Sequence, residues 1–138
     1  MESWDVVVVG AGPAALRAAI ASADAGSSPL MIDAQGTGAA SGGAPTAGLA
    51  VSIEETDSSA HLEDTIAAGG ESVNKEAATR ICSQAVSTLA ELERWGLVLR
   101  RTDAGLPHAS DAPGHTRPRM TGCGDSTLRE VTRILEEQ

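Results

Sequence analysis

Two kinds of group that can hold a nucleotide stand near the start of this 138-residue chain. Gly10 and Gly12 directly follow an unbroken run of valines at 6–9. Gly10 suits a tight turn, and Gly12 lets the backbone come close to a diphosphate. Asp33 lies 23 residues after Gly10, where a carboxylate accepts hydrogen bonds from ribose hydroxyls. These residues together predict a site for a dinucleotide.

The elements that must position these groups follow from the same segment. The valine run predicts a parallel strand buried on both faces. Pro13 suits a first helical turn, and Gly26 a helix end. The N-terminal N–H groups of this helix favour an anion, while Ala15 is small enough for the third position of the glycine fingerprint. A second strand is predicted at 30–32. The alternative is an ordinary βαβ unit with a glycine-rich turn.

Composition narrows the class of protein. The formal net charge is −9, from 19 acidic and 10 basic residues, which argues against nucleic acid as the main partner. The sequence contains no run of 18 apolar residues, so no transmembrane helix is predicted. Cys82 and Cys123 have no CxxC or iron–sulfur spacing, so two thiols in a reducing cytosol and no metal site are expected. Trp4 and Trp95 are the only aromatic residues, which predicts an aliphatic core.

The central part of the chain alternates loops and helices. The segment 34–50 is rich in Gly, Ala, Ser and Thr, and it is interpreted as a loop packed against a flat ligand, with a flexible linker as the alternative. A short strand is predicted at 51–53. A helix capped by Asp57 or Ser58 follows and ends at 69–70.

The C-terminal half continues this alternation. Asn74 is expected to cap a long helix that closes at 95–96, and a hairpin is predicted at 97–106, before an irregular segment at 108–118. Asp125 or Ser126 is expected to cap a last helix with Leu128, Val131, Ile134 and Leu135 on one face. The long helix carries an apolar stripe formed by Ala77, Ile81, Ala85, Leu89 and Leu92.

Four segments, taken in order, resemble the N-terminal part of the flavoprotein subunit of succinate dehydrogenase and fumarate reductase. L-Aspartate oxidase is a close relative of that family. The first is DVVVVGAGPAALRAAI, and the second is the glycine-rich loop with AGL at 47–49. The third is HLEDT at 61–65, and the fourth is ELERWGLVLRRTDAG followed by GHTRPR and Asp125-x-Thr127.

The resemblance implies an α/β fold, a Rossmann-like FAD-binding domain with a parallel sheet. Residues 1–138 would be its N-terminal part, truncated at the C-terminus, with the capping and C-terminal helical domains absent. The implied activity is an FAD-dependent oxidoreductase that interconverts succinate and fumarate by hydride transfer at flavin N5, with L-aspartate oxidase as the alternative. The cofactor-binding positions that it implies are Gly10, Ala11, Gly12, Pro13, Ala14, Ala15, Asp33, Ala34, Ser41, Gly42, Gly43, Thr46, Ala47 and Gly48.

The family's catalytic residues lie in the capping domain, so none is assigned here and the isolated chain is expected to be inactive. Ser41 occupies the position of the histidine that binds flavin covalently in the respiratory enzymes, which implies non-covalent FAD. The implied partners are a C4 dicarboxylate for the full-length protein, a membrane anchor and an iron–sulfur subunit. The location would be cytoplasmic, or peripheral on the cytoplasmic face of the membrane.

A hypothesis of another class is a non-catalytic nucleotide-binding fragment. Without later strands, an open sheet edge would be exposed, so weak FAD binding is expected. For His61, support of the flavin loop and packing in the core are equally favoured. His115, Arg117 and Arg119 are interpreted as a surface loop held by arginine hydrogen bonds, with contact to FAD or an anionic substrate as the alternative. Cys123 is interpreted as a structural thiol.

Overall fold

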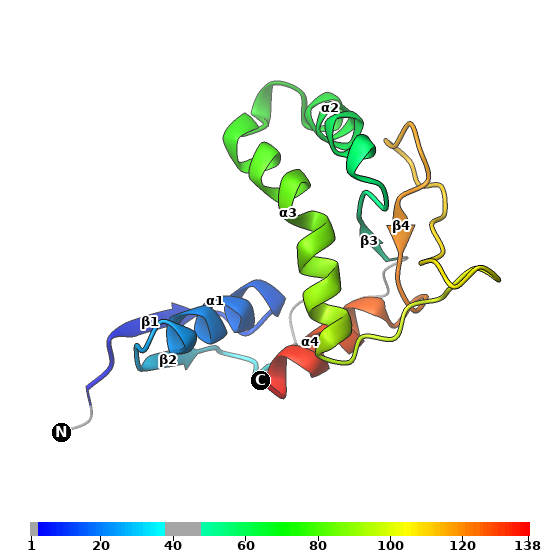
Figure 1. Cartoon of the computed structure of the whole chain (residues 1–138). Helices are drawn as coiled ribbons and strands as arrows, with labels where there is room; N and C mark the ends of the chain where they lie inside the picture. Colours follow the sequence, from blue (N-terminus) through cyan, green and yellow to red (C-terminus); the bar gives the residue numbers. More distant parts are fainter. Residues whose placement is uncertain (1–2, 38–47) are drawn as a thin grey trace. The chain divides into compact units, whose positions relative to one another are not determined.

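The computed structural model describes residues 3–37 and 48–138. These residues divide into two compact units, coloured along the chain in Figure 1. The first unit comprises Met1–Thr46 and Ser126–Gln138, and the second comprises Ala47–Asp125. The first unit is therefore built from two segments far apart in the sequence.

A parallel βαβ unit forms the beginning of the first unit, as the sequence predicts. Strand β1 spans Val6–Val9, helix α1 spans Pro13–Asp24, and strand β2 spans Pro29–Ile32. The strands pair in parallel, in a register that runs from Val6 opposite Pro29 to Val9 opposite Ile32. The predicted α/β class and parallel pairing are therefore confirmed.

Local sequence signals explain where α1 begins and ends. Pro13 occupies the first helical turn, where its missing N–H removes no helical bond. Gly26 has a φ of +84°, a conformation that disfavours side chains with a Cβ. Its N–H donates to Ala23 O at 2.9 Å, and Ser27 N–H donates to Ser22 O at 3.0 Å. These two bonds form a Schellman end, which confirms Gly26 as the terminating residue.

The expectation that β1 is buried on both faces is wrong. Val7 is 54% exposed, Val9 is 82% exposed and Ile32 on β2 is 50% exposed. In the described residues this sheet has two strands only, and α1 packs against both of them. An unbroken valine run indicates a strand, but it does not by itself show that both faces are covered.

Helix α4, at Thr127–Glu136, completes the first unit by packing on α1. Val131, Ile134 and Leu135 are buried, which confirms most of its predicted apolar face, while Leu128 is half-buried. Ser126 occupies the N-cap position, but its side chain makes no capping bond. None of the helices in the described residues is both long and apolar enough to cross a membrane.

The second unit contains two helices and a small antiparallel sheet. Helices α2 and α3 pack against each other, and strand β3 pairs with strand β4 (Figure 1). The predicted strand at 51–53 is wrong by two residues, because Leu49 and Ala50 are the residues opposite Thr121 and Met120. The elements are β3 Leu49–Ala50, η1 Glu55–Asp57, α2 Ser58–Gly69, η2 Gly70–Ser72, α3 Lys75–Arg94 and β4 Met120–Thr121.

Helix α3 begins as predicted, and its buried stripe agrees with the prediction at Leu89 and Leu92 but not in the first half of the helix. Asn74 Oδ1 accepts from Ala77 N–H at 3.0 Å, which confirms the cap. The buried residues, however, are Ala78, Cys82, Leu89 and Leu92. Ile81, which was predicted to be in the stripe, is 66% exposed. The predicted stripe began one residue too early, because a strict four-residue spacing drifts around a helix of 3.6 residues per turn.

Helix α3 ends where the sequence predicts, and a turn follows it. Gly96 has a φ of +109°, and Leu97 N–H donates to Leu92 O at 2.8 Å, so the helix closes at 95–96. A hairpin-like turn follows, in which Thr102 N–H donates to Leu106 O at 2.8 Å. Its arms are joined by a single bridge between Arg101 and Pro107 and form no regular strand.

Candidate functional site

The turn between β1 and α1 is shaped for close approach by a ligand. Gly10 has a φ of +116°, which residues with a Cβ rarely adopt, and its N–H donates to Ile32 O at 2.8 Å. Gly12, the N-cap of α1, has a φ of −83° and a ψ of 177°, which any residue adopts. The backbone therefore does not require glycine at position 12. The absence of a Cβ leaves room above the helix N-terminus, as a bound diphosphate requires.

The N-terminus of α1 offers hydrogen-bond donors without a capping side chain. No side chain caps this helix, and its first turn contains no acidic residue. Ala14 and Ala15 follow Pro13, at helix positions whose N–H groups have no intrahelical acceptor. These donors and the positive end of the helix dipole favour an anion. The residues present therefore fit the diphosphate of a dinucleotide.

Asp33 directly follows β2 and lines a cleft of the first unit. Its Oδ1 accepts from Gln35 N–H and from Gly36 N–H, each at 2.8 Å. Among the described residues, these hydrogen bonds to its carboxylate end on Oδ1, and Oδ2 is a further acceptor. The cleft has a volume of about 530 Å³, within the usual range for ligand sites. It is lined by Ala11, Leu16, Met31, Asp33, Gly36, Thr37 and Glu136.

The other predicted cofactor positions divide into two groups. Ala34 is exposed just after Asp33. Gly48 belongs to the second unit, and a Cβ there would overlap the backbone carbonyl of Thr121, so glycine at 48 allows β3 to approach β4. The remaining predicted positions lie outside the described residues, and they are Ser41, Gly42, Gly43, Thr46 and Ala47.

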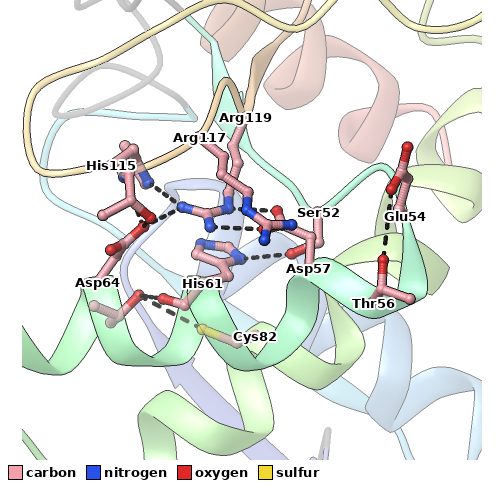
Figure 2. A network of polar contacts seen from close by, with 12 residues as sticks. Ser52, Glu54, Thr56, Asp57, His61, Asp64, Cys82, His115, Arg117 and Arg119 are labelled. Atoms are coloured by element: carbon pink, nitrogen blue, oxygen red, sulfur yellow. Dashed lines mark hydrogen bonds and ion pairs between the residues drawn. The ribbon is translucent and has the colours of Figure 1, made fainter.

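The second unit contains a buried ion cluster that the sequence did not predict (Figure 2). Arg119 is 0% exposed. Its Nε donates to Asp57 Oδ2 at 2.5 Å and its Nη2 donates to Asp57 Oδ1 at 2.8 Å, a bidentate pair. Its Nη1 donates to Asp64 on α2 and lies 3.3 Å from His115 Nδ1. Arg119, the residue before β4, therefore joins η1 and α2 through its side chain and also contacts His115.

This cluster changes the interpretation of several polar residues. Asp57 occupies the N-cap position of α2, but its side chain makes no capping bond, because its carboxylate is taken by Arg119. His61 is buried and lies 3.2 Å from Ser52 Oγ through Nδ1, as the core interpretation expects. The interpretation of 115–119 as a surface loop is wrong for Arg119, which is buried, and fits Arg117, which is exposed and 3.5 Å from Asp57.

The charges of the cluster shift one another's titration. Hydrogen bonds from Arg119 hold the pKa of Asp57 below its usual value. The backbone N–H of Thr116 and the guanidinium of Arg119 lower the pKa of Asp64 to about 2. Burial, and then the charge of Arg119, lowers the pKa of His61. At neutral pH the two carboxylates are therefore charged and the imidazole of His61 is neutral beside the Arg119 cation.

Acidification is expected to destabilise the chain in two stages. The unfolded chain protonates His61 near pH 6.5 while the folded state resists, so stability falls as the pH drops below about 6.5. A second loss is expected below about pH 4, where Asp57 and Asp64 protonate in the unfolded chain first. Urea unfolding followed by Trp95 fluorescence would measure both stages. His61→Gln should flatten the first stage, and an unfolding free energy that is constant from about pH 8 to pH 5 would contradict it.

Comparisons with known proteins agree with the geometry of the first unit. The FAD binding domain family matches residues 5–138. The chain is 34% identical over 136 residues to L-aspartate oxidase of Synechocystis, an alignment that covers 98% of the chain and 24% of that protein. It is 31% identical over 141 residues to one subunit of the CoM/CoB fumarate reductase of Methanothermobacter marburgensis, covering 97% and 25%.

Solved structures show the same fold. The Sdh1 complex of Mycobacterium smegmatis in the apo form contains a chain that matches with a TM-score of 0.88 and 32% identity, covering 99% of this chain and 24% of that one. This chain thus spans about a quarter of the length of these relatives. The predicted family resemblance and FAD as the cofactor are confirmed. The chain belongs to the FAD binding domain family, with the fold of the succinate dehydrogenase and fumarate reductase flavoproteins.

Proposed function

We propose that this chain supplies the FAD-binding cleft of a flavoprotein oxidoreductase that interconverts succinate and fumarate. The observation that carries the proposal is one cleft lined by the carboxylate of Asp33 and by Ala11 and Leu16, which flank the uncapped N-terminus of α1. The residues of α1 would hold the diphosphate, and Asp33 would hold the ribose. FAD, when bound, supplies a hydride acceptor at flavin N5. The described residues orient the cofactor and are assigned no part in proton transfer.

The attachment of FAD is proposed to be non-covalent. The sequence has no histidine between Asp33 and Ala60, and Ser41 stands at the position of the flavin-linked histidine in the family resemblance. A serine hydroxyl does not offer the ring nitrogen that such a bond uses. Acid precipitation of the flavin-loaded chain should leave all flavin in the supernatant. Flavin that stays with the precipitated protein would overturn this attachment.

Asp33→Asn is expected to weaken FAD binding by about five- to tenfold, because charge-assisted hydrogen bonds are replaced by neutral ones. Asn retains a side-chain oxygen that can accept from the backbone N–H groups of Gln35 and Gly36, so the turn after β2 should persist. Equilibrium dialysis of the 138-residue chain with FAD would measure the change. Asp24→Asn is the matched control, since Asp24 is an exposed residue at the end of α1 and does not line the cleft. Equal effects of the two variants would contradict the proposed ribose contact.

The affinity of the isolated chain for FAD is expected to be low. The sheet has one apolar face exposed at Val7, Val9 and Ile32, and the described cleft lies in a unit with two strands. A site that is not covered on all sides leaves much of a ligand in water. Purified chain that is yellow with a stoichiometric flavin would overturn this expectation.

L-Aspartate oxidase is the second candidate, favoured by the 34% identity to the Synechocystis enzyme. Succinate and aspartate are both C4 dicarboxylates, so the two proposals share a substrate class. The partners proposed for the succinate/fumarate activity alone are a membrane anchor and an iron–sulfur subunit. A flavoprotein that carries this chain should reduce fumarate with a reduced dye and leave L-aspartate unchanged. Oxidation of aspartate without fumarate reduction would favour the second candidate.

A further inference from the structure

The nucleotide cleft has a wall that the βαβ segment does not supply. Glu136, the last residue of α4, lines the cleft together with Asp33. It is brought there by the packing of α4 on α1, where its neighbours Ile134 and Leu135 are buried. Both carboxylates belong to the first unit, although 103 positions separate them in the sequence. The cleft is therefore more acidic than its N-terminal segment alone indicates.

The charges along the cleft are unequally distributed. The N-terminus of α1 provides donors for an anion, whereas Asp33 and Glu136 add two negative charges. The described residues that line the cleft include no Lys or Arg. Sites that accept a phosphate on the adenosine ribose use a nearby Arg for it. Such a cation is missing here from the described lining, and a second carboxylate is present.

We propose that Glu136 is a specificity-determining residue that selects adenosine nucleotides with free ribose hydroxyls. This proposal rests on the proposed function, because it places a dinucleotide in the same cleft. Ribose hydroxyls can donate hydrogen bonds to carboxylates, which are strong acceptors. A 2′-phosphate would instead place a second anionic group beside Asp33 and Glu136, and like charges in a shared site repel. Glu136 thus acts mainly by disfavouring nucleotides that carry a 2′-phosphate.

The test compares AMP with adenosine 2′,5′-bisphosphate, two probes of the adenosine end of the cofactor that differ only by the 2′-phosphate. Amide NMR spectra of the 138-residue chain, titrated with each nucleotide, report binding at Ala14 and Ala15 even when it is weak. The wild-type chain should bind AMP more tightly. Glu136→Gln should raise the affinity for the bisphosphate about tenfold relative to AMP, as the loss of one charge repulsion implies. The unbound spectra confirm that each variant is folded.

Glu137→Gln is the control, with the same loss of charge one residue further along. Glu137 is exposed and pairs with Arg133 at 2.7 Å, and it does not line the cleft. An unchanged preference in Glu136→Gln, or an equal change in Glu137→Gln, would overturn the role of Glu136 while leaving the proposed function intact. If neither nucleotide shifted the amide signals of 14 and 15, the proposed cleft itself would be wrong.

Discussion

Replacing Arg119 by methionine is expected to lower the unfolding free energy by about 3–5 kcal/mol, the usual cost of removing one partner from a buried ion pair. Methionine fills a similar volume, so the loss comes mainly from charge. Asp57 and Asp64 would remain buried without the cation that donates hydrogen bonds to both. A loss of this size is a large fraction of the stability of a small domain.

Urea unfolding followed by Trp95 fluorescence, in a Trp4→Phe background, would measure the effect in the second unit. Arg117→Met is the matched control, because Arg117 also pairs with Asp57 but its side chain is 55% exposed. Exposed pairs contribute about 0–1 kcal/mol. If the two variants lost equal stability, the buried cluster would not be what holds this unit together.

A second variant separates the charge of Arg119 from its shape. Adding Asp57→Asn and Asp64→Asn to Arg119→Met removes the uncompensated carboxylates, so part of the lost stability should return. If the triple variant were less stable than the single one, the hydrogen-bond geometry would matter more than the charges. In either case, the unfolding free energy of the triple variant should depend less on pH below about pH 4, because the two carboxyl groups with a lowered pKa have been removed.

The βαβ segment could be predicted from sequence because its signals are local. Gly10, Pro13 and Gly26 each act within one turn of their own position, and the structure places each in the predicted role. The same is true of Asn74, whose side chain caps α3 through a bond to a residue three positions away. Element ends that depend on such bonds need no knowledge of the rest of the chain.

The ion cluster could not be predicted, since its partners are distant in sequence. Asp57 carries a strong N-cap signal, yet its carboxylate bonds to Arg119, 62 positions further on. A guanidinium offers two parallel donors, so it outcompetes the backbone N–H groups of α2 for that carboxylate. The GHTRPR segment is rich in charge, and its sequence predicts an irregular backbone. Nothing in that sequence indicates that Arg119 is buried while Arg117 is exposed.

Sequence patterns also do not indicate which segments form one unit. The βαβ segment reads as self-contained, but α4 packs on α1 from about 100 residues further along the chain. An amphipathic pattern predicts that a helix packs, without saying against what. The acidic wall of the nucleotide cleft was missed for the same reason, because Glu136 belongs to that distant helix.

Ile134→Ala tests this dependence, and it is expected to lower the unfolding free energy by about 2–4 kcal/mol, as cavity-forming substitutions in cores do. Ile134 is 0% exposed, so deleting its methyl and methylene groups leaves a void in the packing of α4. Ile81→Ala on α3 makes the identical chemical change where the side chain is 66% exposed, and about 0.5 kcal/mol or less is expected there.

Unfolding followed by Trp4 fluorescence, in a Trp95→Phe background, reports the first unit directly, since Trp4 lies two residues before β1. If α4 stabilises the βαβ segment, Ile134→Ala should shift this transition, although 130 positions separate the substitution from the reporter. The preference of the chain for AMP over adenosine 2′,5′-bisphosphate, read from the amide shifts at Ala14 and Ala15, should fall as well, because Glu136 would no longer be held at the cleft. An unchanged Trp4 transition would show that the βαβ segment folds without α4, and the cleft would then be the property of residues 3–37 alone.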